Sequence, residues 1–146
     1  DDYRWLKSNI KSTSLLGNIM TMNSAKDTGC DEVIMHKNNL MTEGGASNIF
    51  FANNDTVFTP SLSNNILPGI TRELLINEVK NIGIKVEEGD FQLRELENAH
   101  SIWLTSSTKG LAQVTEIINL ETNVIEDHNL FQKCEQIFVK KFLSGS

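Results

Sequence analysis

The chain has 146 residues, a formal net charge of −6 at pH 7 and an isoelectric point near 5.0. This length is typical of one domain whose core forms without disulfides or metal. The acidic balance leaves no basic stripe to neutralise phosphates, so we expect no nucleic acid and no anionic membrane surface as partners. No apolar run approaches the ~20 residues that span a bilayer, and no signal segment opens the chain, which favours a cytoplasmic protein.

The two cysteines, Cys30 and Cys134, lie far apart, and neither has a Cys-x-x-Cys partner or a nearby His at metal-ligand spacing. Neither a metal site nor a disulfide framework is therefore indicated, and two reduced thiols are the simplest interpretation. The chain begins without Met, and residues 3–6 have the character of the middle of a strand. We therefore expect residues to precede Asp1, with 1–146 forming a single domain of a longer protein.

The first half of the chain predicts one helix followed by two hairpins. Hydroxyl residues at 12–14 offer N-caps to a helix over about 14–28, which Gly29 ends. Asn-rich turns tolerate the positive φ that tight hairpins demand. The expected strands and turns are 32–36 and 39–42 about Lys37-Asn38, and 47–52 and 57–59 about residues 53–55.

The second half opens with an Asn/Ser-rich loop between Pro60 and Pro68, and an amphipathic helix follows it. Its predicted apolar face is Leu74, Leu75, Val79 and Ile82, and Gly83 caps it. The other predicted elements are a strand at 84–87, a short helix at 92–99, strands at 101–105 and 114–120, and a terminal helix over 128–142. Mixed elements with recurring hairpins favour a mixed α/β (α+β) domain over a doubly wound parallel sheet.

Three local features could carry chemistry, and each is weak alone. Lys11 lies beside hydroxyl residues, where most lysines are solvated surface groups. Glu43 lies in a Gly-rich segment, where most carboxylates are turn residues. Gly69-Ile70-Thr71 opens a helix and could bind an anion through backbone N–H groups, although a capped helix start without a ligand is the commoner case.

The order in which short segments occur is more informative than any one of them. Thr-Glu-Gly-x-x-Ser-Asn-Ile-Phe at 42–50 is followed by Ile-Leu-x-Gly-Ile-Thr-Arg at 66–72. With their neighbours, from residue 3 to about 120, these segments resemble the fold-type IV (class IV) pyridoxal-phosphate enzymes. That family includes D-amino-acid aminotransferases, branched-chain aminotransferases and aminodeoxychorismate lyases. The supporting segments are Arg4-Trp5, Ile10-Lys11-Ser12, residues 29–34, Thr59-Pro60 and Ser106-Ser107-Thr108.

The resemblance implies the C-terminal pseudo-barrel domain of the D-amino-acid aminotransferase-like fold, with pyridoxal 5'-phosphate as cofactor. Lys11 would form the Schiff base with the cofactor and then shuttle the proton between the substrate α-carbon and C4'. Glu43 would pair with the pyridine nitrogen and keep it protonated, so that the ring accepts electrons.

The resemblance also assigns the rest of the cofactor site. The backbone N–H groups of Ile70 and Thr71, with the Thr71 hydroxyl, would hold the phosphate at a helix N-terminus, aided by Ser107 and Thr108. The remaining candidates are Leu67 against a ring face, Ser47 and Asn48 shaping the pocket, and Arg4, which would lie either behind the residues that touch the cofactor or on its phosphate side.

The implied activity of the intact enzyme is transamination between a D-amino acid, such as D-alanine, and a 2-oxo acid such as 2-oxoglutarate. A homodimer is expected, and the isolated domain would be impaired without the N-terminal domain. Aminodeoxychorismate lyase, which eliminates pyruvate, and branched-chain aminotransferase are the rival enzymes, and a catalytically silent binding module is the alternative of another class. Gln113 and Ala46 stand where relatives often carry Pro and Ser, which weakens the subfamily assignment.

Overall fold

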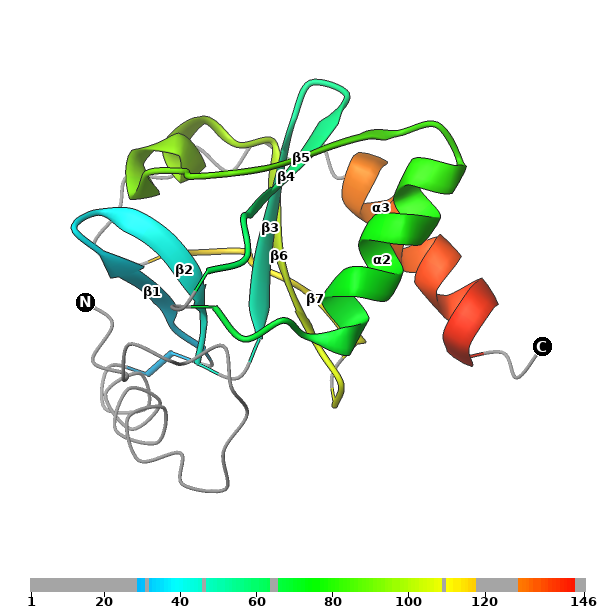
Figure 1. The fold of residues 1–146 in the computed structure, drawn as a ribbon, viewed down its shortest axis with the longest axis horizontal. Coiled ribbons are helices and arrows are strands. Elements are labelled where there is room, and N and C mark those ends of the chain that lie inside the picture. Colours follow the sequence, from blue (N-terminus) through cyan, green and yellow to red (C-terminus); the bar gives the residue numbers. More distant parts are fainter. Residues whose placement is uncertain are drawn as a thin grey trace.

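The computed structural model describes residues 29–30, 32–45, 47–63, 66–108, 110–117 and 129–143, and the helix expected over 14–28 lies outside them. The described chain contains both strands and helices, which confirms the mixed α/β class (Figure 1). The strands are β1 (Ile34–Lys37), β2 (Leu40–Gly44), β3 (Asn48–Asn53), β4 (Thr56–Pro60), β5 (Lys85–Gly89), β6 (Ser101–Ser106) and β7 (Gly110–Gln113). The helices are α2 (Ile70–Asn81), the 3₁₀ helix η1 (Leu93–Asn98), α3 (Asn129–Phe138) and the π-helix η2 (Val139–Leu143).

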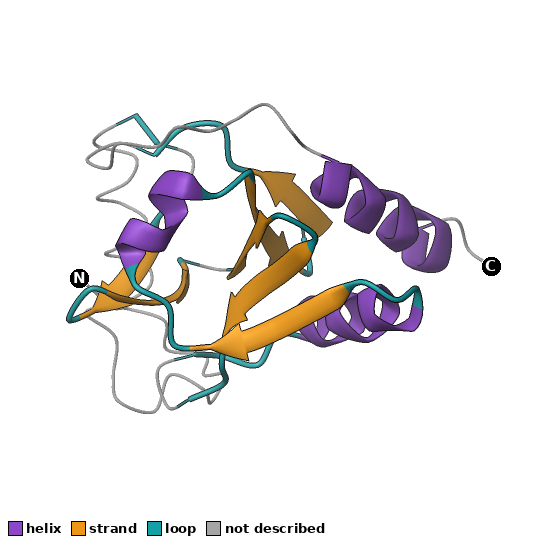
Figure 2. Cartoon of the chain, turned by 90° about the horizontal axis from the view of Figure 1, so that it is seen from above, coloured by secondary structure: helices purple, strands orange, loops and turns teal. Residues whose placement is uncertain are grey.

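A five-stranded sheet in the order β5-β4-β3-β6-β7 forms the centre, and β1 and β2 form a separate antiparallel hairpin. Helices α2 and α3 lie side by side on one face of this sheet (Figure 2). The hairpin packs on the opposite face, because Met41 of β2 shares a buried cluster with Ile49 and Phe51 of β3. None of the helices in the described ranges is long and apolar enough to cross a membrane.

Both predicted hairpins are confirmed, and asparagines make their turns. Asn38 and Asn39 have φ of 51° and 67°, so the first turn lies one residue later than expected. Asn54 has a φ of 54° in the turn between β3 and β4. Asparagine tolerates this left-handed conformation better than most residues with a side chain, which explains why these positions predicted the turns.

The strand expected over 114–120 is wrong. The return strand, β7, begins at Gly110, whose φ of 67° lets the chain reverse directly after β6. Pairing of Ser106 with Gly110 and of Trp103 with Gln113 fixes the register of this hairpin. The backbone N–H of Val114 still donates to Ile102, but residues 114–117 form no strand, and 118–120 lie outside the described residues.

The predicted buried face of α2 is partly wrong. Leu75 and Val79 are buried, but Leu74 is 37% and Ile82 53% exposed. The stripe that faces the sheet instead takes in two polar residues of the first turn, of which Arg72 bonds to Pro60 and Glu88. The buried residues are Thr71, Arg72, Leu75, Ile76 and Val79.

The remaining elements lie close to where the sequence predicts them. Strand β5 runs parallel to β4, so β4, α2 and β5 form a β-α-β unit. A capping box between Gln92 and Glu95 begins the short helix, which is a 3₁₀ helix. Helix α3 covers the sheet as expected, with Phe131 and Cys134 packed on the stacked rings of Phe50 and Trp103.

Candidate functional site

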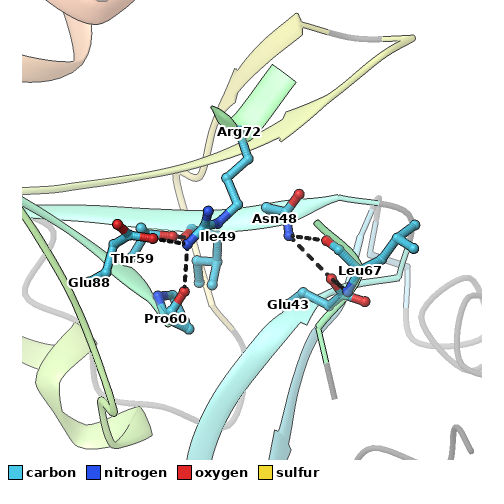
Figure 3. A network of polar contacts seen from close by, with 8 residues as sticks. All are labelled: Glu43, Asn48, Ile49, Thr59, Pro60, Leu67, Arg72 and Glu88. Atoms are coloured by element: carbon cyan, nitrogen blue, oxygen red, sulfur yellow. Dashed lines mark hydrogen bonds and ion pairs between the residues drawn. The ribbon is translucent and has the colours of Figure 1, made fainter. Parts of the chain in front are cut away.

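Glu43 is a buried carboxylate near the end of β2, with 4% of its surface exposed. Its Oε2 accepts a hydrogen bond from the backbone N–H of Leu67 at 3.0 Å and another from the Asn48 side-chain amide at 3.2 Å (Figure 3). Two N–H donors on one oxygen favour the ionised carboxylate over the neutral acid. The charge is therefore held in place inside the protein, where it can pair with a cationic ring nitrogen.

Asn48 links Glu43 to the loop before α2. Its Nδ2 also donates to the Leu67 carbonyl oxygen at 3.1 Å, so Glu43, Asn48 and Leu67 form a closed ring of hydrogen bonds (Figure 3). Asn48 is the first residue of β3 and is buried, with 6% exposed. The structure thus brings together three predicted site residues that are separated by up to 24 positions in the sequence.

The N-terminus of α2 lies at the same end of the sheet. Gly69 is the N-cap and provides no side-chain cap, so the first-turn N–H groups, those of Ile70 and Thr71 included, point out of the helix without an intrahelical acceptor. A Cβ at position 69 would overlap Asn48 Oδ1, so the start of α2 is packed directly on the Asn48 side chain. Thr71 is buried, whereas the Ile70 side chain is 74% exposed. Ile70 can therefore contribute its backbone N–H, and not its side chain, to anion binding.

Ser107 and Thr108 lie in the turn between β6 and β7 and are exposed. Thr105 of β6 pairs with Asn48 of β3, so this turn follows directly from the strand end that is beside Asn48. The Thr108 hydroxyl lies 3.5 Å from that of Ser106. These hydroxyls are therefore at the sheet end from which α2 begins.

Ser47 closes the Gly-rich segment after Glu43. The backbone N–H of Gly44 donates to the Ser47 carbonyl at 2.7 Å, and a Cβ at Gly44 would overlap the Ser47 hydroxyl. Glu32 clamps this turn from outside: its carboxylate accepts from the Gly45 N–H at 2.9 Å and from the Ser47 hydroxyl at 3.2 Å. Ser47 is thus part of the turn that supports Glu43.

Two predicted site residues, Lys11 and Arg4, lie outside the described residues, so their positions stay predictions. Two residues of the site were missed. The sequence placed Glu32 only in a strand and Arg72 only in a motif. In the structure the buried Nη2 of Arg72 donates to both Pro60 O and Glu88 Oε1. A charged residue inside the first turn of a helix that opens an anion-binding motif is the sequence signal that could have singled out Arg72.

This set of groups fits pyridoxal phosphate. A buried carboxylate with two N–H donors suits a protonated pyridine nitrogen, and an uncapped helix N-terminus suits a phosphate dianion. Asn48 connects the two, which puts them at one end of the same sheet. The fold and these groups together define a domain of the pyridoxal-phosphate enzymes of fold type IV.

Comparison with known proteins supports the same class. Residues 1–117 match the family model described as amino-transferase class IV, and the chain belongs to this family. The D-alanine aminotransferase of Listeria monocytogenes serotype 4b is 35% identical over 145 residues, which are 99% of this chain and 50% of that protein. The chain therefore spans about half the length of the curated relatives it matches.

Solved structures agree on the fold. A structure from Legionella pneumophila, provisionally named as a 4-amino-4-deoxychorismate lyase, superposes with a TM-score of 0.82 at 27% identity, over 94% of this chain and 53% of that one. The branched-chain amino acid aminotransferase of Escherichia coli superposes with a TM-score of 0.81 at 24% identity, over 88% of this chain and 42% of that one. The latter identity supports a shared fold alone.

Proposed function

We propose that the full-length protein is a pyridoxal-phosphate-dependent transaminase that exchanges the amino group of a D-amino acid, such as D-alanine, with a 2-oxo acid such as 2-oxoglutarate. The observation that carries this proposal is the buried Glu43 carboxylate, whose Oε2 is fixed by Asn48 and Leu67 beside the N-terminus of α2. The similarity to D-alanine aminotransferases over nearly the whole chain supports the substrate class.

Each residue has a distinct task in this proposal. Bound in the site, the cofactor supplies an electron sink for the bonds of the substrate α-carbon. Glu43 holds a proton on the ring nitrogen, which keeps that sink strong. The N–H groups of Ile70 and Thr71 bind the phosphate and orient the ring, with Ser107 and Thr108 as further donors. Lys11 holds the cofactor covalently and moves the proton at the α-carbon.

Leu67 completes the orientation of the ring in this proposal. Its backbone N–H and carbonyl are both engaged, by Glu43 and Asn48, so the segment that carries the side chain is fixed at both polar groups. A fixed aliphatic side chain against one ring face would exclude water from that side. Arg4 remains a candidate on the phosphate side, and mutation of Arg4 with a measurement of cofactor affinity tests it.

The family resemblance also supports a homodimer in the cytoplasm for the full-length protein. Sedimentation of the purified protein tests the dimer, because a monomer that retains full activity would contradict it. Substrates are small molecules, and the charge of −6 offers no support for a nucleic-acid partner.

Aminodeoxychorismate lyase is the second candidate, and the similarity to the Legionella pneumophila structure favours it. Both activities release pyruvate from these substrates, but only the transaminase transfers the amino group to 2-oxoglutarate and so forms glutamate. Full-length protein loaded with cofactor is incubated with D-alanine and 2-oxoglutarate, and separately with 4-amino-4-deoxychorismate. We expect glutamate to form in the first reaction, whereas pyruvate released only in the second would replace the transaminase proposal by the lyase.

A silent binding module is the alternative of another class. The presence of both Lys11 and Glu43 argues against it, because a domain without chemistry has no use for the pair. Addition of the cofactor to full-length protein distinguishes the two: the enzyme shifts the cofactor's visible absorption band, and an unchanged spectrum would favour the silent module.

A further inference from the structure

Asn48 makes more polar contacts within the site than any assigned role requires. A side-chain amide has two N–H donors, and Nδ2 of Asn48 donates to Glu43 Oε2 at 3.2 Å and to the Leu67 carbonyl at 3.1 Å. Both donors are therefore committed to the protein. Asn48 is also buried, with 6% of its surface exposed, so its amide nitrogen is occupied by the site's own framework.

The other end of the same amide is packed on the start of α2. Gly69 has φ of −66° and ψ of 140°, a conformation that any residue adopts, so its backbone does not require glycine. Glycine is required at position 69 because the Asn48 side chain lies so close that a Cβ there would overlap Asn48 Oδ1. The helix that offers its N-terminus to an anion is therefore positioned by direct contact with Asn48.

We propose that Asn48 is a positioning residue that couples the carboxylate end of the cofactor site to its phosphate end. One side chain holds the Glu43 oxygen and the backbone of Leu67 (Figure 3). It also packs on Gly69, the N-cap of α2. A rigid cofactor needs its two anchoring groups at one separation, and the amide of Asn48 sets that separation. This inference rests on the proposed function, because it assumes that one ligand contacts both ends.

The consequence is measurable as a ratio of affinities. Pyridoxal lacks the phosphate, so the ratio of its dissociation constant to that of pyridoxal phosphate reports how well the phosphate end is used. Glu43→Gln removes the charge that faces the ring nitrogen but keeps a side-chain oxygen that can accept from Leu67 and Asn48, so it weakens both ligands by the same factor. Disturbance of Asn48 acts at both ends, so it weakens the phosphorylated ligand more, and the ratio falls.

The test uses the full-length apoprotein and titrates it with pyridoxal and with pyridoxal phosphate. Asn48→Asp keeps the side-chain volume but removes both N–H donors and faces Glu43 with a second carboxylate. Glu43→Gln is the comparison at one end. Asn54→Asp is the matched control. Asn54 is an exposed turn residue with a positive φ, and both Asn and Asp tolerate that conformation.

We expect Asn48→Asp to lower the affinity ratio at least tenfold, and Glu43→Gln and Asn54→Asp to leave it within twofold of the unmodified protein. If Asn48→Asp does not fold, Gly69→Ala replaces it, because the added methyl displaces the Asn48 carbonyl without changing its chemistry; the same fall in the ratio is expected. An unchanged ratio in a folded variant overturns the coupling. An unmodified protein that binds neither ligand would refute the proposed function itself.

Discussion

Nη2 of Arg72 lies 2.6 Å from Oε1 of Glu88, so an ion pair ties the first turn of α2 to β5. The same nitrogen donates to the Pro60 carbonyl at 3.0 Å, at the end of β4 (Figure 3). The Arg72 side chain is 4% exposed and that of Glu88 is 36% exposed, so the burial of the pair is one-sided. The two partners of Nη2, Pro60 O and Glu88 Oε1, explain why a charged residue can lie in the buried stripe of α2.

We predict that Glu88→Ala destabilises the fold more than Arg72→Met. Loss of Glu88 leaves the buried guanidinium with the Pro60 carbonyl but without its charged partner. Because the Glu88 side chain is 36% exposed, the cost in the free energy of unfolding lies at the lower end of the about 3–5 kcal/mol that is typical of buried pairs. Loss of Arg72 leaves the Pro60 carbonyl without this donor, which costs about 1–3 kcal/mol in the free energy of unfolding. The Glu88 carboxylate is exposed enough to be hydrated in that variant. Urea unfolding of both variants and of the double variant measures this. Equal costs, or additive effects in the double variant, would show that the pair does not act as described.

The Glu32 clamp gives a second prediction. Glu32→Ala removes the acceptors of the Gly45 N–H and the Ser47 hydroxyl, so the turn after Glu43 loosens. We expect a loss of about 1–2 kcal/mol in unfolding free energy, on the scale of unpaired polar groups, and weaker cofactor binding. Glu87→Ala is the control, since Glu87 is a partly exposed residue of β5 that pairs with the exposed Lys85. Cofactor affinity equal in the two variants would disprove the clamp.

Burial raises the pKa of the Cys134 thiol from 9.0 to about 12. The folded state therefore keeps its proton where the unfolded state loses it, and Cys134 contributes stability that is fully present below pH 9 and declines as pH rises towards 12. The expected slope is at most about 1.4 kcal/mol per pH unit within that window. Chemical unfolding of the unmodified protein and of Cys134→Ala between pH 8 and pH 10.5 measures it, and parallel curves would contradict it.

Thiol labelling checks the same burial at neutral pH. Cys134 has 0% exposure, whereas Cys30 is partly exposed. A disulfide reagent should therefore label Cys30 in the native protein and Cys134 only after denaturant is added, because the thiolate is the reactive form and burial disfavours it. Labelling of both thiols at one rate would contradict the packing of α3 on the sheet.

Glu43→Gln tests the carboxylate directly. The amide keeps the volume but removes the charge that would hold a proton on the ring nitrogen. We expect kcat for transamination to fall about 100-fold or more, the scale for removal of one preorganised electrostatic contact in an active site. Asn54→Asp serves again as the control that leaves the rate unchanged. A Glu43→Gln enzyme with ordinary kcat would exclude the assigned role.

Local chemistry explains what the sequence predicted well. The turns at Asn38 and Asn54 depend on the residue that adopts positive φ, and helix α2 depends on spacing within one segment. Strand β7 was misplaced because its register depends on pairing with β6, and the alternating segment at 114–117 forms no strand. Hydrophobic pattern alone cannot reveal pairing between strands.

The candidate site divides in the same way. Motif order pointed to Glu43, Leu67 and Thr71 as members of one site, but no spacing rule could show that the Asn48 amide joins residues 43 and 67. The close packing of Gly69 on Asn48 was equally hidden, because the glycine is required by contact and has an ordinary backbone conformation. Such contacts exist only once β3 and the loop before α2 are brought together.

The central claim is that this chain carries pyridoxal phosphate on one particular lysine. The most direct test is to reduce the cofactor-loaded, full-length protein with borohydride and then to map its peptides by proteolysis and mass spectrometry. The account predicts one phosphopyridoxyl group, on the peptide that contains Lys11. A label on another lysine, such as Lys37 or Lys85, or no label in protein that binds the cofactor, would contradict it.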